Sequence, residues 1–274
     1  MGIRTWSASF EGADAHRVDV QVQIAGGMPA FSVVGLADKA VAESRERIRA
    51  AFAAIGLSLP VQRIIVNLAP ADRPKEGAHF DLPIALGLMA AMGVLPGDFV
   101  EEHLVMGELG LDGTIAPSPG ALPAAMLALA EDLGFICPAD CGPEAAWAGG
   151  ELAILAPRSL LQLVNHVRGD QVLSRPQPGE LVDAGPVADL RDVRGQETAK
   201  RALEIAAAGG HNLLMIGPPG SGKSMLASRL PGLLPPLDAR ELLDVSRIQS
   251  VAGLLDRGRL TRTRPFRAPH HSAS

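Results

Sequence analysis

A glycine-rich loop followed by lysine and serine is the stretch of this sequence whose residue types could do phosphate chemistry. Residues 217–224 read GPPGSGKS, which fits the pattern G-x-x-x-x-G-K-[ST]. Glycine permits backbone angles that are closed to other residues, so successive N–H groups can turn toward a phosphate. The lysine can then reach the β- and γ-phosphates, and the serine hydroxyl can bind Mg²⁺. The loop therefore predicts a site for ATP and Mg²⁺.

The elements around the loop stand in the order that this motif requires. The apolar run Leu213–Ile216 predicts a buried parallel strand, and a helix-forming segment follows the loop. Within the loop, Lys223 is the predicted catalytic residue and Ser224 the predicted metal ligand. The predicted nucleotide-binding residues of the loop are Gly217, Pro218, Pro219, Gly220, Ser221, Gly222, Lys223 and Ser224.

The rest of an ATPase site is harder to place in this sequence. A P-loop ATPase also needs a strand that ends in an aspartate, the Walker B strand, with a glutamate beside it for the attacking water. The stretches ELLD (241–244) and AGLLD (252–256) have short apolar runs, and Val245 or Arg257 stands where the glutamate would follow. We therefore expect neither to be that strand, and we interpret the chain as the front part of a longer ATPase.

The end of the chain is basic. Five arginines lie between residues 257 and 267, with Phe266 among them. Such a cluster suits the binding of a phosphate backbone, and it equally suits a solvated hairpin. The adjacent His270 and His271 are not expected to share a metal ion. The arginines are Arg257, Arg259, Arg262, Arg264 and Arg267.

Composition limits the remaining classes of protein. The 274 residues carry a net charge of -5, with 11 Lys/Arg against 19 Asp/Glu in residues 1–168 and 14 against 11 in residues 169–274. We therefore expect a polyanion to bind to residues 169–274.

Cys137 and Cys141 are too few for a structural zinc site, and we expect them to be packing thiols. No secretory signal or membrane span is expected, because the longest apolar run, 82–96, is short and bounded by prolines. We predict a cytoplasmic protein.

The segments ahead of the loop predict a mixed α/β domain over residues 1–168. Apolar and polar residues alternate at 18–24, which is typical of a half-buried strand. An amphipathic helix runs from Ala37 to Gly56, and its apolar face carries Val41, Ile48, Phe52 and Ile55. We expect its charged residues to form a solvated surface, with a binding face as the alternative. Residues 169–190 are rich in Pro and Gly and form the predicted linker. The other predicted elements are strands at 30–36 and 63–70, a buried helix at 81–94, a hairpin at 103–115, helices at 121–133, 158–167 and 196–208, and strands at FICP and LAILAP.

Several blocks of the sequence resemble the YifB/ComM group of bacterial magnesium-chelatase-like AAA+ ATPases. They are FSVVGLADKAVAESRERIRAAF, NLAPADRPKEGAHFDLPIALG, GELGLDGTIAPSPG, DVRGQETAKRALEIAAAGGHNLLMIGPPGSGKS and RPFRAPHHSAS. The resemblance implies an α/β fold: a Lon-protease-like (ribosomal protein S5 domain 2-like) α+β domain over 1–168, the linker 169–190, and over 191–274 the front of a P-loop AAA+ α/β domain. On this resemblance, we expect the last domain to be truncated at Ser274, before its Walker B strand.

The resemblance also implies roles for single residues. A segment such as 192–196 packs near the adenine in AAA+ proteins, so Val193, Gly195 and Gln196 are expected to bind the nucleotide; a plain turn into the helix is the alternative. In the Lon-like block RPKEGAHFD the nucleophilic serine is replaced by His79, and the matching lysine falls near Ala124. A serine–lysine dyad needs a hydroxyl and an amine, so no protease activity is expected.

Three functions stay open at this stage. The resemblance favours an ATP-driven homo-oligomer, hexameric in the complete protein, that acts on DNA as a branch-migration motor or helicase in recombination and natural transformation. A second is a chelatase-type ATPase that remodels a protein partner for metal insertion. A third is a non-hydrolysing nucleotide-binding or assembly module. In each case this chain is expected to bind ATP without efficient hydrolysis.

Overall fold

The alternating segment predicted at 18–24 lies within the longest strand of the structure, β2 (Asp14–Ala25). The computed structural model describes residues 2–183, 187–270 and 272. By its internal contacts the chain divides into unit 1, Met1–Glu180 with Ser246–Arg259, and unit 2, Leu181–Val245 with Leu260–Ser274. Three residues of the predicted linker, 184–186, lie outside the described residues, as do His271 and Ser274.

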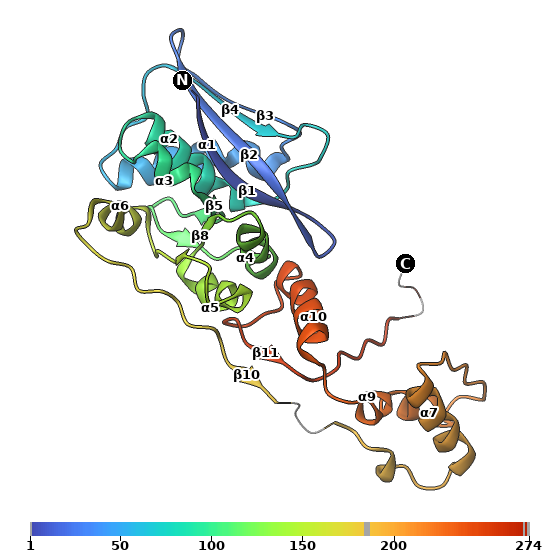
Figure 1. The fold of residues 1–274 in the computed structure, drawn as a ribbon. Coiled ribbons are helices and arrows are strands. Elements are labelled where there is room, and N and C mark those ends of the chain that lie inside the picture. The colour runs from blue at the N-terminus through green and yellow to red at the C-terminus, as the bar shows by residue number, and fades with distance from the viewer. Residues whose placement is uncertain (1, 184–186, 271, 273–274) are drawn as a thin grey trace. The chain divides into compact units, whose positions relative to one another are not determined.

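Unit 1 is built on a seven-stranded, mostly parallel sheet (Figure 1). Its strands besides β2 are β1 (Ile3–Glu11), β3 (Ala30–Val34), β4 (Arg63–Ala69), β5 (His103–Val105), β8 (Gly134–Ile136) and β9 (Ile154–Leu155). Their order is β3-β4-β2-β1-β5-β8-β9. The pairs β1–β2 and β2–β4 are antiparallel, and the other four pairs are parallel. Together with its helices, this sheet gives the expected α/β fold.

The predicted hairpin at 103–115 is smaller than expected. Residues 103–105 join the main sheet as β5, paired with β1 and β8. Only β6 (Glu108–Leu109) and β7 (Ile115–Ala116) form the antiparallel pair around the turn at Asp112-Gly113. The turn prediction is therefore confirmed, and the extent of the hairpin is wrong.

Two hydrophobic clusters hold the helices of unit 1 against its sheet. The first joins the buried valines of β2, Val18, Val20 and Val22, to α1, α2 and α6. The second joins Leu104 and Phe135 of the sheet to α4 and α5. The helices of unit 1 are α1 (Lys39–Ala54), α2 (Asp81–Ala91), α3 (Gly97–Glu101), α4 (Ala121–Ala130), α5 (Gly142–Ala145) and α6 (Leu160–Arg168).

The helix α1 buries the predicted face and differs from the prediction at one charge. Val41, Ile48 and Phe52 are fully buried. The charged residues were expected to be solvated, but the Arg47 Nε atom donates to the Asp81 carboxylate at 2.5 Å, and the Asp81 side chain is fully buried. Arg47 therefore ties α1 to the start of α2.

Unit 2 has a small core beneath α7 (Glu197–Gly209) and α8 (Lys223–Ala227). Its buried residues are Leu190, Val193, Leu203 and Leu226. Its strands β10 (Leu181–Val182) and β11 (Leu260–Thr261) form one short parallel pair. The remaining helices are α9 (Leu230–Leu233) and the first residues of α10 (Ala239–Val251).

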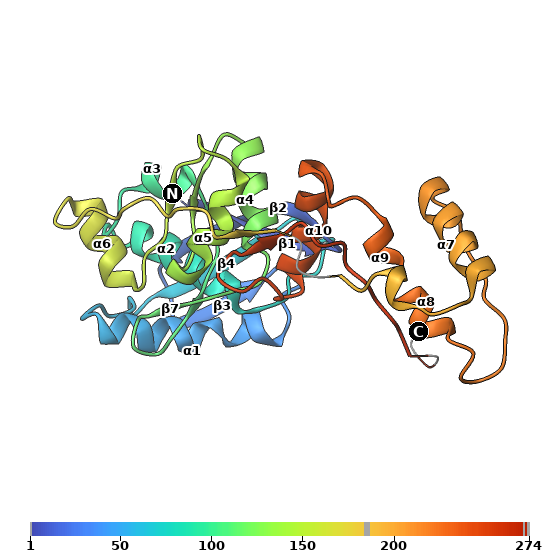
Figure 2. The same cartoon turned by 90° about the horizontal axis from the view of Figure 1, so that it is seen from below.

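The strand predicted at Leu213–Ile216 is wrong. These residues form no strand, and Figure 2 shows the connection from α7 to α8 as a loop. Leu214 is 82% exposed and Ile216 88% exposed. A strand needs a hydrogen-bonded neighbour, and the β10–β11 pair, the only ladder among the described residues of unit 2, does not reach this segment. None of the helices in the described part of the chain is long and apolar enough to cross a membrane.

Candidate nucleotide-binding site

At two positions of the loop 217–224, the backbone has the glycine-dependent conformation that the sequence predicts. Gly220 has φ +81° and Gly222 has φ +85°, in the left-handed region that favours glycine. Gly222 also begins α8 as its N-cap residue. A Cβ atom at Gly222 would lie 2.9 Å from the Gln196 Nε2 atom. The tight turn between loop and helix therefore depends on glycine.

The Lys223 ammonium lies inside the curve of this loop. Its Nζ atom donates to the carbonyl oxygens of Gly217 at 2.8 Å and Pro218 at 2.9 Å, and to Ser221 Oγ at 3.3 Å. These contacts bring the cation to the side of the loop where a phosphate would be held. A phosphate oxygen can replace such neutral acceptors, because a charge-assisted hydrogen bond between ions is stronger.

A pocket of about 470 Å³ lies beside the loop. One wall is the apolar segment 213–216, and another is α7, which contributes Thr198, Ala199 and Ala202. The volume lies in the range of pockets that bind small molecules and cofactors. The α7 wall was not predicted from the sequence, although residues 198 and 202 are one helical turn apart and share a face. The predicted site residues that line the pocket are Gln196, Gly217, Pro218, Ser221 and Lys223.

Gln196 connects the start of α7 to the loop. It is the N-cap residue of α7 with φ +58°, an uncommon conformation for a residue with a side chain. Its Nε2 atom donates to the Ser221 carbonyl oxygen at 3.5 Å. In this strained backbone conformation, the Gln196 side-chain amide contacts the phosphate loop. Strained backbone conformations are concentrated at functional sites.

The other predicted residues lie nearby without lining the pocket. Ser224 is exposed in the first turn of α8, and Gly195 is exposed with φ +69°. Val193 is only 2% exposed and belongs to the small core of unit 2. Pro219, Gly220 and Gly222 complete the loop.

The two stretches considered for a Walker B strand form no strand. Residues 241–244 lie in α10, and residues 252–256 lie in turns and coil after it. Of the five clustered arginines, Arg264 donates to both carboxylate oxygens of Glu241, at 3.0 and 2.8 Å, and Arg259 pairs with Glu180 at 3.3 Å. No group of three or more His, Cys, Asp or Glu residues that could hold a metal occurs in the described part of the chain.

The two cysteines are packing thiols, as predicted. Cys137 and Cys141 are free and buried. Burial raises the pKa of Cys141 to about 12 and that of Cys137 well above its usual value. Both thiols are therefore protonated and unreactive at neutral pH.

Comparison with known proteins defines the class. Residues 20–140 match the profile of the family described as subunit ChlI of Mg-chelatase, and residues 189–274 match that described as magnesium chelatase, subunit ChlI. The chain is therefore magnesium-chelatase-like.

Sequence identity to individual relatives shows to which group of this family the chain belongs. The chain is 43% identical to YifB of Escherichia coli over 96% of its length and 52% of that protein's. It is 42% identical to a protein of Mycobacterium tuberculosis over 99% and 54% of the two chains. It is 40% identical to the competence protein ComM of Haemophilus influenzae over 98% and 54%. The chain belongs to the YifB/ComM family, and it spans about half the length of these relatives.

Proposed function

We propose that this chain binds ATP and Mg²⁺ through the loop 217–224, as the nucleotide-binding part of a chelatase-like AAA+ ATPase. The observation that carries the proposal is the Lys223 ammonium inside the glycine loop, beside the pocket of about 470 Å³. Lys223 binds the β- and γ-phosphates, and Ser224 provides the protein oxygen for Mg²⁺. When bound, Mg²⁺ neutralises charge between the phosphates.

Equilibrium titration with ATP tests this proposal. Lys223→Ala should weaken ATP binding by at least about tenfold, since a charge-assisted hydrogen bond is lost. The matched control is Lys200→Ala, which removes a lysine of α7 that donates to the Glu197 carboxylate at 3.2 Å. Equal affinity in the wild type and both variants would refute a site at this loop.

We expect binding without efficient hydrolysis. Among the described residues, Asp244 lies on a helix and Asp256 in a turn, and neither stands at the end of a strand beside the loop. The carboxylate that orients Mg²⁺ and the base that activates water are therefore not in place. Lys223-dependent turnover by this chain would contradict this expectation.

For the physiological role we favour action on DNA. The support is the similarity to ComM, whose name is competence protein, together with the arginines of residues 257–267. In this proposal the assembled protein is a homo-oligomer, hexameric when complete, that drives branch migration or unwinding in recombination. Arg267→Ala should weaken binding of a forked DNA, and affinity that is unchanged in low salt would count against the DNA role.

A second candidate has support of its own. Both matched profiles describe a subunit of magnesium chelatase, which favours an ATPase that remodels a protein partner for metal insertion. A third candidate is a nucleotide-binding assembly module without turnover. Failure with forked, branched and single-stranded DNA would favour these over the DNA motor.

For residues 1–168, which lie in unit 1, we propose a Lon-like domain without protease activity. The His79 ring is buried, with Nε2 2.9 Å from the Ala8 carbonyl oxygen, and burial lowers its pKa. Ala124 is fully buried in α4. These two positions provide neither the hydroxyl nor the amine that the dyad needs. Cleavage of an unfolded substrate such as casein by the purified chain would contradict this.

A further inference from the structure

Residues 246–259, here called the docking arm, follow the nucleotide-binding region in sequence but pack in unit 1. They lie within the second family match, 189–274, and they belong by contacts to unit 1. The docking arm contains the second half of α10 and the turns after it. Its contacts reach residues more than a hundred positions earlier in the chain.

The centre of this contact is the carboxylate of Glu144. It accepts from Ser250 Oγ at 2.5 Å and from the Leu122 backbone N–H at 2.9 Å. The Gly120 N–H in turn donates to the Ser250 carbonyl oxygen at 3.1 Å. Ser250 is 1% exposed and Glu144 8% exposed. A buried carboxylate needs such donors, so the start of α4 and Ser250 satisfy it together.

A second contact fixes the end of the docking arm. The Trp147 Nε1–H donates to the Gly258 carbonyl oxygen at 2.7 Å. Gly258 has φ +67°, and a Cβ atom there would lie 2.4 Å from the Glu144 nitrogen. Only glycine therefore fits at this position. The two contacts give unit 1 a surface shaped for this particular segment.

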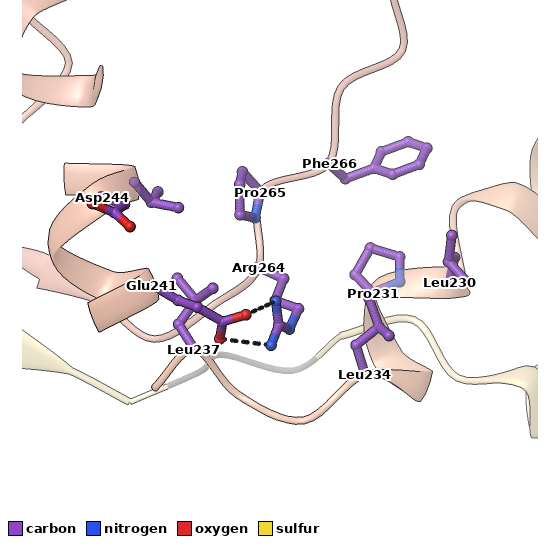
Figure 3. A pocket seen from close by; sticks show the side chains of 10 residues that line it. Leu230, Pro231, Leu234, Leu237, Glu241, Asp244, Arg264, Pro265 and Phe266 are labelled. Carbon is purple, nitrogen blue, oxygen red and sulfur yellow. Dashed lines mark hydrogen bonds and ion pairs between the residues drawn. The ribbon is translucent and has the colours of Figure 1, made fainter. Parts of the chain in front are cut away.

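Within unit 2, the start of α10 is held close to the helices that follow the phosphate loop. Figure 3 shows Arg264 paired with Glu241 of α10, in a pocket whose other wall includes Leu230 and Pro231 of α9. The Arg264 Nε atom also donates to the Pro235 carbonyl oxygen at 2.6 Å. Leu230 follows the last residue of α8 by three positions. A change at the phosphate loop can therefore reach α10 through α9.

We infer that the surface of unit 1 around Glu144 and Trp147 is the docking site of the arm, and that docking is linked to nucleotide binding at Lys223. This inference rests on the proposed function. By linkage, release of the arm changes ATP affinity by the same factor by which ATP changes the docking equilibrium. The arm is thus a route by which nucleotide binding is communicated to unit 1.

The two tryptophans allow a direct test, because both lie in unit 1 and each donates its indole N–H. The Trp147 indole reports docking, and the Trp6 indole, which donates to the Glu101 carbonyl oxygen at 2.8 Å, reports the fold of unit 1. Hydrogen exchange of both is followed by NMR with and without MgATP. Ser250→Ala is compared with Ile248→Ala, because Ile248 is 54% exposed on the same helix.

The expected result has three parts. Ser250→Ala should speed Trp147 exchange by about tenfold or more, the effect of losing one buried hydrogen bond, with Trp6 unchanged. It should also shift ATP affinity by at least about fivefold. Ile248→Ala should do neither. Gly258→Val, which blocks the second contact, should reproduce the effect if Ser250→Ala fails to fold.

Different results separate the two ideas. The linkage would be overturned if Trp147 exchanged faster in Ser250→Ala with unchanged ATP affinity, and if Trp147 exchange in the wild type did not respond to MgATP. These results would leave the proposed nucleotide site unaffected. Unchanged Trp147 exchange in both Ser250→Ala and Gly258→Val would overturn the docking surface. Absence of ATP binding by the wild type would overturn the proposed function, and the linkage with it.

Discussion

Replacing Arg47 by methionine should destabilise unit 1 strongly. Arg47 holds the Asp81 carboxylate with two hydrogen bonds, at 2.5 and 3.0 Å, and Asp81 is fully buried. After the change, the Asp81 carboxylate still accepts from the Leu109 N–H at 3.2 Å. It then has no counter-ion among the described residues. Breaking a buried ion pair from one side costs about 3–5 kcal/mol, because the remaining charge stays buried.

Urea unfolding followed by tryptophan fluorescence measures this loss, since Trp6 and Trp147 both lie in unit 1. With a slope of about 2 kcal/mol/M, the midpoint should fall by about 2 M. The double variant Arg47→Met with Asp81→Leu should recover most of the loss, because it leaves no buried charge.

The control is Arg45→Met on the same helix, whose exposed pair with Glu46 at 2.8 Å contributes at most about 1 kcal/mol. If Arg47→Met shifts the midpoint no more than Arg45→Met does, the buried pair is not what ties α1 to α2. The same conclusion would follow if the double variant were as unstable as Arg47→Met alone.

Three further predictions follow from the site and the core. Burial lowers the pKa of His79 below its usual 6.5. As the pH decreases through 6.5, the unfolded chain therefore takes up a proton that the folded chain does not, and the free energy of unfolding decreases. His79→Gln should flatten this loss in urea unfolding between pH 7 and pH 5, and an unchanged slope would contradict the assignment. Gly222→Ala should weaken ATP binding by about tenfold or more in titration, because alanine is strained at φ +85° and its Cβ atom would crowd the Gln196 amide. Wild-type affinity in this variant would mean that the loop geometry is not required. Cys137 and Cys141 should resist a disulfide reagent in the native protein at pH 8 and react after unfolding, and rapid native reaction would show that the thiols are accessible.

The sequence predicted elements whose signal is local. The alternation at 18–24 identified part of β2, and the apolar face of α1 was read correctly, because each pattern matches the period of its element. β1 was missed for the same reason. Its polar and apolar residues alternate over 5–10, but the polar residues Thr5, Ser7 and Ser9 are buried, so the usual pattern of apolar residues on the buried face is absent.

The rest depends on contacts between distant residues. Leu213–Ile216 has the composition of a buried strand, but a strand forms only beside a partner, and the described residues of unit 2 provide none there. The ion pair Arg47–Asp81 and the contact Glu144–Ser250 join residues 34 and 106 positions apart. Neither has a local pattern that a sequence reading could detect.

For the candidate site, the motif predicted the residue types and the structure supplied their neighbours. The glycine-dependent turn at Gly222 follows from the sequence, because glycine tolerates the positive φ. The packing of Val193 in the small core could not be predicted from the sequence, and the spacing of Thr198 and Ala202 shows only that they share a helix face, not that this face lines the pocket. These positions depend on how α7 packs against α8.

The most direct test of the central claim is photo-crosslinking with an azido derivative of ATP, followed by mass spectrometry of the labelled peptides. The account predicts labelling within residues 196–226, around the pocket beside the loop. It also predicts that unlabelled ATP competes for this labelling and that Lys223→Ala loses it. Labelling confined to unit 1, or labelling within 196–226 that persists in Lys223→Ala and resists competition, would contradict a nucleotide site at this loop.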